Sequence, residues 1–271
     1  NMIEMLKVII LGIVQGITEW LPVSSTGHMI LFNEFIKMNV SETFMSTFLV
    51  VIQFGSILAV LTIFFKKLNP FDVSKTKIQK SETIDLWIKV IIAVIPSGIL
   101  GLLFDDTIDA LFFNPTTVAI ALIVYGIIMI MLENRNKKPS VNSFSEVSYK
   151  LAIGIGLFQC LALIPGTSRS GSTIIGAVLL GTSRYIATEF SFFLAVPTML
   201  GASALKLVKT GFAFSGFEWL ILATGSIVAY IVSILAIKFL LDYIKKHDFK
   251  VFGYYRIVLG ILVLAYFFLI K

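Results

Sequence analysis

Six stretches of this 271-residue chain are apolar over about the length needed to cross a lipid bilayer. A membrane-spanning helix needs about 20 mostly apolar residues, because its backbone polar groups must be hydrogen-bonded inside the span. The stretches are 44–65, 87–104, 116–132, 185–206, 217–241 and 253–270. Only 14% of the residues are charged, whereas a soluble domain carries about a quarter. The sequence therefore predicts an all-α integral membrane protein with six transmembrane helices and a single membrane domain, residues 1–271.

Four further apolar segments are too short to span a bilayer, and they flank two polar loops. Segments 5–17 and 29–37 flank the first loop, and segments 151–164 and 172–182 flank the second. Short apolar segments separated by a polar loop that contains Pro and Gly predict two re-entrant helical hairpins. Ordinary short, tightly packed spans are the alternative interpretation.

The charges between the apolar stretches predict how the chain is oriented. With six crossings, segments 66–86, 133–150 and 242–250 lie on one side and are rich in Lys and Arg. Segment 105–115, on the other side, has three Asp and no Lys or Arg. The positive-inside rule makes the basic side cytoplasmic. The net charge of +6 therefore reflects topology and contact with anionic lipid, and it predicts no nucleic-acid partner.

The two hairpins resemble copies of one another. At a constant offset of 144 positions, four residues recur, and these pairs are Gly12 and Gly156, Gln15 and Gln159, Ser24 and Ser168, and Gly27 and Gly171. The topology has the hairpins entering from opposite sides, which predicts an inverted-topology repeat with both loops near the midplane. Pseudo-repeat 1 covers about 1–132, pseudo-repeat 2 covers about 150–271, and a cytoplasmic loop, 133–149, joins them.

The first loop begins with a carboxylate at membrane depth. Gln15 and Glu19 are four residues apart, which places both on one face of the first short helix. The Glu19 carboxylate could hold a divalent cation, orient an imidazole or take a proton. A purely structural pair with a neighbouring Arg is the alternative. Pro22 ends this helix, because proline disfavours helix in the residue before it.

A row of hydroxyls and an imidazole follow. Ser24, Ser25 and Thr26 predict the start of the next helix, with one of them as the N-cap. Ser25 and His28 are three residues apart, so on a helix they share a face within hydrogen-bond reach, with Gly27 between them. A serine, a histidine and a carboxylate are the groups needed to activate a hydroxyl nucleophile. Plain helix capping is the alternative for the hydroxyls alone.

The second loop has the composition of an anion site. Arg169 stands among small and hydroxyl-bearing residues, which are Thr167, Ser168, Ser170, Gly171 and Ser172. Glycine admits close backbone approach, a helix N-terminus offers free N–H groups, and Arg binds phosphate oxygens with two parallel hydrogen bonds. The loop therefore predicts an oxyanion cradle. A structural Arg169–Glu19 pair is the alternative, and it is compatible with the cradle.

The sequence of both loops closely resembles the bacitracin-resistance family of undecaprenyl-diphosphate phosphatases. The resemblance rests on residues 15–28 and 165–173, and it extends over 51–60 and 183–192. It implies hydrolysis of the C55 isoprenyl diphosphate to the monophosphate and phosphate, which recycles the lipid carrier for cell-wall synthesis. It also implies a multi-pass protein of the bacterial plasma membrane whose active site faces the outer side.

The resemblance assigns roles to particular residues. The family's acidic motif falls on Gln15 and Glu19, its serine and histidine fall on Ser25 and His28, and its arginine falls on Arg169. Many relatives have Glu where this chain has Gln15. A divalent cation, Mg²⁺ or Ca²⁺, would therefore depend on Glu19, substrate oxygens and water. The expected partners are a long-chain isoprenyl diphosphate and the membrane, no organic cofactor is implied, and a homodimer is a further partner to test.

A second class of function uses the same architecture. An inverted-repeat carrier or flippase for an anion or a lipid phosphate would also place broken helices at the midplane. A transport site, however, needs no cluster of serine, histidine and carboxylate. The sequence therefore favours the phosphatase.

Overall fold

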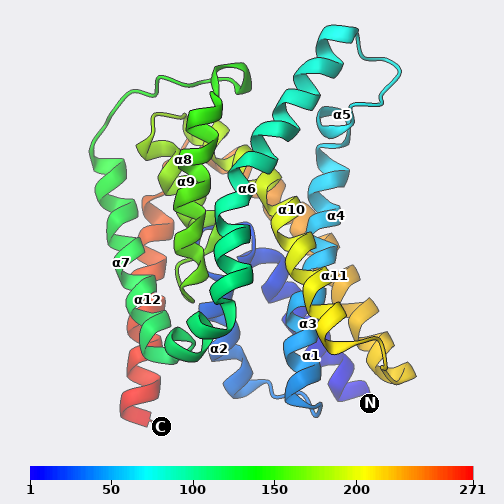
Figure 1. The fold of residues 1–271 in the computed structure, drawn as a ribbon. Helices are drawn as coiled ribbons and strands as arrows, with labels where there is room; N and C mark the ends of the chain where they lie inside the picture. The colour runs from blue at the N-terminus through cyan, green and yellow to red at the C-terminus, as the bar shows by residue number, and fades with distance from the viewer. Residues whose placement is uncertain (271) are drawn as a thin grey trace.

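The computed structural model describes residues 1–270, and in that part of the chain it contains helices and no strand. The short helices near the first loop are α1 (Met2–Thr18) and α2 (Ser25–Phe35), and those near the second are α8 (Tyr149–Gln159), η2 (Cys160–Leu163) and α9 (Arg169–Leu179). The remaining elements are α3 (Glu42–Val51), α4 (Gln53–Ile63), α5 (Phe65–Leu68), α6 (Lys77–Phe112), α7 (Pro115–Asn134), η1 (Phe144–Glu146), α10 (Arg184–Thr210), α11 (Gly216–Ile244), α12 (Lys250–Ala265) and η3 (Tyr266–Ile270). Figure 1 shows them as one elongated bundle.

The structure confirms six helices long and apolar enough to span a membrane within the described residues. They are Glu42–Ile63, Lys77–Phe112, Pro115–Asn134, Arg184–Thr210, Gly216–Ile244 and Lys250–Ile270. The first of them is α3 and α4 together, interrupted at Ile52. Each contains the corresponding apolar stretch of the sequence or most of it, so hydropathy alone located the spans.

The helical ends extend further into polar sequence than hydropathy predicts. Segments 66–86 and 105–115, expected as loops, are partly helical because α6 runs from Lys77 to Phe112. Its start is fixed by a capping box in which the Thr76 side chain accepts the Gln79 N–H and the Gln79 side chain accepts the Thr76 N–H. These hydrogen bonds satisfy groups that a helix N-terminus leaves open, so the helix begins well before its apolar core.

The basic segments gather at one end of the bundle. The α5–α6 and α7–α8 connections lie at the top of Figure 1, whereas both chain termini and the end of α6, which carries the three Asp of segment 105–115, lie at the bottom. Lys245, at the end of α11, lines the same cavity as Arg135 and therefore belongs to the top end. We call this end, with loops 69–76, 135–148 and 245–249, the basic end.

Glycines allow pairs of helices to approach closely. A Cβ on Gly55 of α4 would collide with the backbone of Ser226 in α11, and a Cβ on Gly156 of α8 would collide with the backbone of Ala93 in α6. Small residues at helix contacts bring backbones together in membranes, where packing replaces the hydrophobic effect between helices. The short helix α8 is thus fixed against the long helix α6.

The two short helices that follow the polar loops correspond residue by residue. Helices α2 and α9 have 11 residues each, and adding 144 to the bounds of α2 gives the bounds of α9. Each is preceded by a serine with positive φ, 68° at Ser24 and 76° at Ser168. The recurrence that four residues indicate in the sequence therefore extends to the backbone conformation of both loops.

Candidate active site

Two helix N-termini with unpaired N–H groups form the framework of the site. The Ser24 side chain accepts the Gly27 N–H at 3.2 Å, and the Ser168 side chain accepts the Gly171 N–H at 3.0 Å. The carbonyl oxygens of the same two serines accept the N–H groups of His28 and Ser172. A helix start leaves its first N–H groups without a partner inside the helix. On each of these two helices, the N–H groups of the first two residues therefore have no hydrogen bond. These belong to Ser25 and Thr26 on α2, and to Arg169 and Ser170 on α9.

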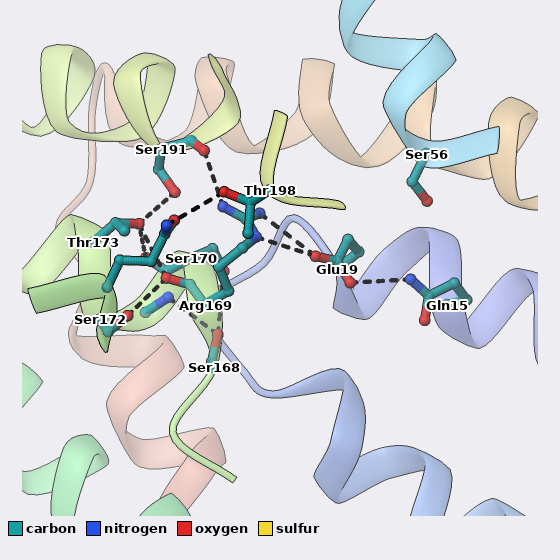
Figure 2. Close-up of polar contacts among 12 residues, drawn as sticks. Gln15, Glu19, Ser56, Ser168, Arg169, Ser170, Ser172, Thr173, Ser191 and Thr198 are labelled. Atoms are coloured by element: carbon teal, nitrogen blue, oxygen red, sulfur yellow. Dashed lines mark hydrogen bonds and ion pairs between the residues drawn. The ribbon is translucent and has the colours of Figure 1, made fainter. Parts of the chain in front are cut away.

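Glu19 and Arg169 connect the two loops by a buried ion pair. Arg169 Nε lies 3.4 Å from Glu19 Oε1, and the second carboxylate oxygen, Oε2, accepts a hydrogen bond of 3.0 Å from the Gln15 amide. Arg169 Nη1 also donates to the Ser191 carbonyl oxygen at 3.0 Å (Figure 2). The guanidinium lies over the Trp20 ring, 5.7 Å from its centroid. The structural pair expected as an alternative is therefore formed, and it places the arginine beside the carboxylate.

Hydroxyl groups of α9 and α10 surround the backbone of Arg169. Thr173 Oγ1 lies 2.7 Å from Ser191 Oγ, and Ser172 Oγ donates to the Arg169 carbonyl oxygen at 2.9 Å. Ser170 Oγ lies 3.2 Å from Ser168 Oγ and donates to the Leu21 carbonyl oxygen of the first loop at 3.4 Å. Figure 2 shows these side chains around the start of α9. Their contacts hold the second loop in one conformation.

His28 is held by groups other than those expected. Its Nδ1 lies 2.8 Å from the Ser24 carbonyl oxygen and its Nε2 lies 2.6 Å from the Tyr255 hydroxyl, with the two rings stacked. Both ring nitrogens are therefore engaged, and the expected Ser25–His28 hydrogen bond is not formed. Glu19 contacts Arg169 and Gln15 instead of His28. The half-buried Ser25 hydroxyl makes no hydrogen bond within the described part of the chain.

Arg256 is a further site residue, and sequence reasoning missed it. It is fully buried in α12, where Nη1 donates to the Pro22 carbonyl oxygen at 3.2 Å and Nη2 donates to the Gly166 carbonyl oxygen at 2.9 Å. Its guanidinium also donates to carbonyl oxygens of α7, those of Ala121 and Leu122. Arg256 thus joins the two loops directly. The signal in the sequence was a single cation inside the apolar stretch 253–270. A charged side chain within a membrane span indicates a functional role by default.

Two buried donors beside the loops have no partner. Trp20 Nε1 and Thr167 Oγ1 are buried and make no hydrogen bond among the described residues. Gly166 has a φ of +94°, and a Cβ there would collide with the Val118 backbone, so glycine is required just before Thr167. Buried polar groups are nearly always hydrogen-bonded, and such exceptions therefore point to a missing ligand or water. Together with the four free N–H groups of the same two loops, they give this region a surplus of hydrogen-bond donors, as an anion site requires.

Comparison with known proteins fits this geometry. The sequence model of the bacitracin resistance protein BacA family matches residues 8–262. The chain belongs to this family. The match includes both loops and Arg256, so the whole site lies within the BacA family region.

Several BacA relatives are similar over nearly their full length. The chain is 77% identical over 270 residues to undecaprenyl-diphosphatase 1 of Clostridioides difficile, covering 100% of this chain and 98% of that protein. It is 58% identical over 269 residues to an undecaprenyl-diphosphatase of Desulfitobacterium hafniense, covering 98% and 97%. A third, from Enterococcus faecalis, is 60% identical over 269 residues, covering 97% of each chain.

Glu19 is the residue of the two loops that the sequence suggests as a ligand for a divalent cation. Within residues 1–270, no group of three or more His, Cys, Asp or Glu side chains could hold a metal ion. Glu19 is the carboxylate of the first loop, and both of its oxygens are engaged by Arg169 and Gln15. Mg²⁺ and Ca²⁺ prefer several oxygen ligands. Glu19 and Gln15 alone do not supply them.

Proposed function

We propose that this chain is an undecaprenyl-diphosphatase, which hydrolyses the C55 isoprenyl diphosphate to the monophosphate and inorganic phosphate. The activity recycles the lipid carrier for cell-wall synthesis and confers bacitracin resistance. The observation that carries the proposal is that the Glu19–Arg169 ion pair and Arg256 hold together two loops that each lead into a helix N-terminus with free N–H groups, inside an integral membrane protein. Helix N-termini and Arg are the groups that bind phosphate oxygens best.

In this proposal the diphosphate binds between the two loops. The N–H groups of Arg169 and Ser170 and the Arg169 side chain bind the terminal phosphate, together with the Thr167 hydroxyl. The N–H groups of Ser25 and Thr26 face the same substrate from the first loop. Donors fixed in place before the reaction stabilise the charge that develops on phosphoryl transfer. Arg256 acts on the reaction through the loops, because its hydrogen bonds go to their carbonyl oxygens.

The proposed nucleophile is Ser25, whose hydroxyl has no competing hydrogen bond. Its oxygen attacks the terminal phosphorus, the bond to the bridging oxygen breaks, and the isoprenyl monophosphate leaves. His28 accepts the hydroxyl proton, which requires the ring to release the Tyr255 hydroxyl. Water then hydrolyses the phosphoserine and releases phosphate. Direct attack by water, or by His28 itself, is the competing mechanism.

The cation requirement is a separate proposal. Glu19 offers a single carboxylate, so a divalent cation would depend on the oxygens of the diphosphate and on water. Under this proposal a cation arrives with the substrate.

The orientation in the membrane follows from the charges. We place the basic end in the cytoplasm of a bacterial cell and the chain in the plasma membrane, with the site open to the outer side. The hairpins α1–α2 and α8–α9 are then re-entrant and belong to an inverted repeat. The matching bounds of α2 and α9 and the matching φ of Ser24 and Ser168 support this arrangement.

Phosphate release in detergent tests the function. Purified protein is incubated with a long-chain isoprenyl diphosphate, with and without EDTA, beside the Arg169→Ala and Arg135→Ala variants. We expect release by the wild type and by Arg135→Ala, an exposed arginine of the basic end, and a loss of at least 100-fold in Arg169→Ala. A detergent solution has no compartments, so transport cannot be observed in it. A carrier does not break the diphosphate bond, and it would therefore release no phosphate. No release from folded wild-type protein would favour the carrier, and loss in EDTA would establish the cation.

A further inference from the structure

A polar cavity lies at the basic end, built by residues outside the two loops. It has a volume of about 320 Å³ and lies between the end of α7, the α7–α8 connection, the start of α10 and the end of α11. We call it the basic pocket. Its polar lining includes Arg135, Lys137, Lys138, Thr182, Tyr185 and Lys245.

A buried hydroxyl without a partner lines the basic pocket. Thr182 is 2% exposed, and its Oγ1 makes no hydrogen bond within the described residues. The backbone of Thr182 is fixed, since its N–H donates to the Ala177 carbonyl oxygen at 3.0 Å. A buried hydroxyl costs free energy when it is left unpaired. Because Thr182 lines the cavity, a ligand bound there could supply the missing partner.

The N-terminus of α10 opens at the same place. Ser183 caps the helix by accepting the Ile186 N–H on its side chain and the Ala187 N–H on its carbonyl oxygen. The N–H groups of Arg184 and Tyr185 are thus the two that remain open. Both residues line the cavity. Open N–H groups and the positive end of the helix dipole favour an anion.

The charges around the pocket also favour an anion. The buried Glu133 carboxylate is engaged by the Arg184 guanidinium and by the Phe249 N–H. Arg135, Lys137 and Lys138 are exposed and have no acidic partner among the described residues. The one acidic group of the lining is therefore already neutralised by its own arginine, whereas these three cations are not.

We propose that the basic pocket binds a phosphate group, carried by a lipid headgroup or present as free inorganic phosphate. The Thr182 hydroxyl and the N–H groups of Arg184 and Tyr185 donate to its oxygens, and the three unpaired cations attract its charge. The pocket shares no residue with the two-loop site, so the proposal does not rest on the diphosphatase activity.

Binding of radiolabelled inorganic phosphate to the purified full chain in detergent tests the site. The Arg169→Ala variant serves as the parent, so that binding at the two-loop site is reduced. Into it are placed Thr182→Val, Thr182→Ser, or the triple change Arg135→Gln, Lys137→Gln and Lys138→Gln. A matched control replaces Lys66 and Lys77, which are exposed at the same end, by Gln. A second arm counts phosphatidic acid molecules bound to each protein by native mass spectrometry, with phosphatidylcholine as the neutral lipid.

We expect Thr182→Val and the triple change each to weaken phosphate binding about tenfold or more, because a hydrogen bond to a charged group is lost or the attraction is removed. Thr182→Ser keeps the hydroxyl and retains binding, as does the Lys66 and Lys77 control. If the variants lose binding of phosphatidic acid as well as of inorganic phosphate, the ligand of the pocket is a lipid headgroup. If they lose binding of inorganic phosphate alone, the ligand is the free anion.

Equal phosphate affinity and equal lipid occupancy in all variants would overturn the proposal. So would an equal loss in the Lys66 and Lys77 control, since binding would then reflect general positive charge. If Thr182→Val does not fold, judged by its elution profile, the triple change and Thr182→Ser still decide between these outcomes.

Discussion

Ser24 and Ser168 lie 144 positions apart and hold the same backbone conformation, with φ of 68° and 76°. Each accepts the N–H of the glycine three residues later, and each begins an 11-residue helix. A non-glycine residue with positive φ is uncommon and strained, and such strain gathers at functional sites. The two serines therefore fix the direction in which both helix N-termini present their N–H groups.

Substitutions of these serines distinguish the contribution of the capping hydrogen bond to stability from the cost of the positive φ. We expect Ser168→Ala to destabilise the protein by roughly 1–3 kcal/mol, because the cap is lost and the positive φ remains. Ser168→Gly removes the same cap but adopts the positive φ freely, so it should cost less. Thermal unfolding of both variants in detergent, with the same pair at Ser24, measures the difference. Equal stability of the Ala variant and the wild type would contradict the role of the cap.

The buried Glu19–Arg169 pair predicts an asymmetry between two substitutions of the arginine. Arg169→Lys keeps the charge but loses the planar fork, so we expect near-normal stability and a fall in turnover of at least tenfold. Arg169→Ala leaves the buried Glu19 carboxylate without its cation and with only the Gln15 hydrogen bond, which costs about 3–5 kcal/mol. Phosphate release and thermal unfolding, measured on both variants, test this. Full activity of Arg169→Lys would show that the charge alone is sufficient.

The free hydroxyl of Ser25 predicts loss of activity without loss of stability. Ser25→Ala removes no hydrogen bond of the described chain, so its unfolding temperature should match the wild type. As the proposed nucleophile, Ser25 should be essential, with turnover reduced by a factor of about 100 or more. Acid quenching during turnover, followed by mass spectrometry, should find phosphate on Ser25. Near-normal turnover of folded Ser25→Ala would instead support water or His28.

Arg256 predicts a loop-positioning effect distinct from that of Arg169. Arg256→Met keeps most of the side-chain volume but leaves the carbonyl oxygens of Pro22 and Gly166 without their donor. Hydrogen bonds to charged groups contribute about 1.5–3 kcal/mol each, so we expect a destabilisation of at least about 3 kcal/mol together with reduced turnover. A variant with wild-type stability and low turnover would place Arg256 on the substrate instead.

Much of the fold was predictable because hydropathy reflects the solvent. The six apolar stretches became the six candidate spans, and the four short segments became α1, α2, α8 with η2, and α9. The start of α2 among Ser24, Ser25 and Thr26 also followed from local residue types, since serine is a preferred cap, whereas the cap at Ser168 was not predicted. The extension of α6 to Lys77 and Phe112 was not predicted, because hydrogen bonds at its start and not hydropathy decide where it begins.

The sequence by itself determined the helical membrane architecture, the two polar loops and the residue types of an anion site, because these depend on composition and short spacings. Only the tertiary structure decided which groups meet. In the structure Glu19 pairs with Arg169, 150 positions away, and His28 is hydrogen-bonded to Tyr255 instead of Ser25. Arg256 donates hydrogen bonds to both loops. Such contacts join residues far apart in the chain, and they form because a buried charge or ring nitrogen must find a partner wherever packing brings one within reach.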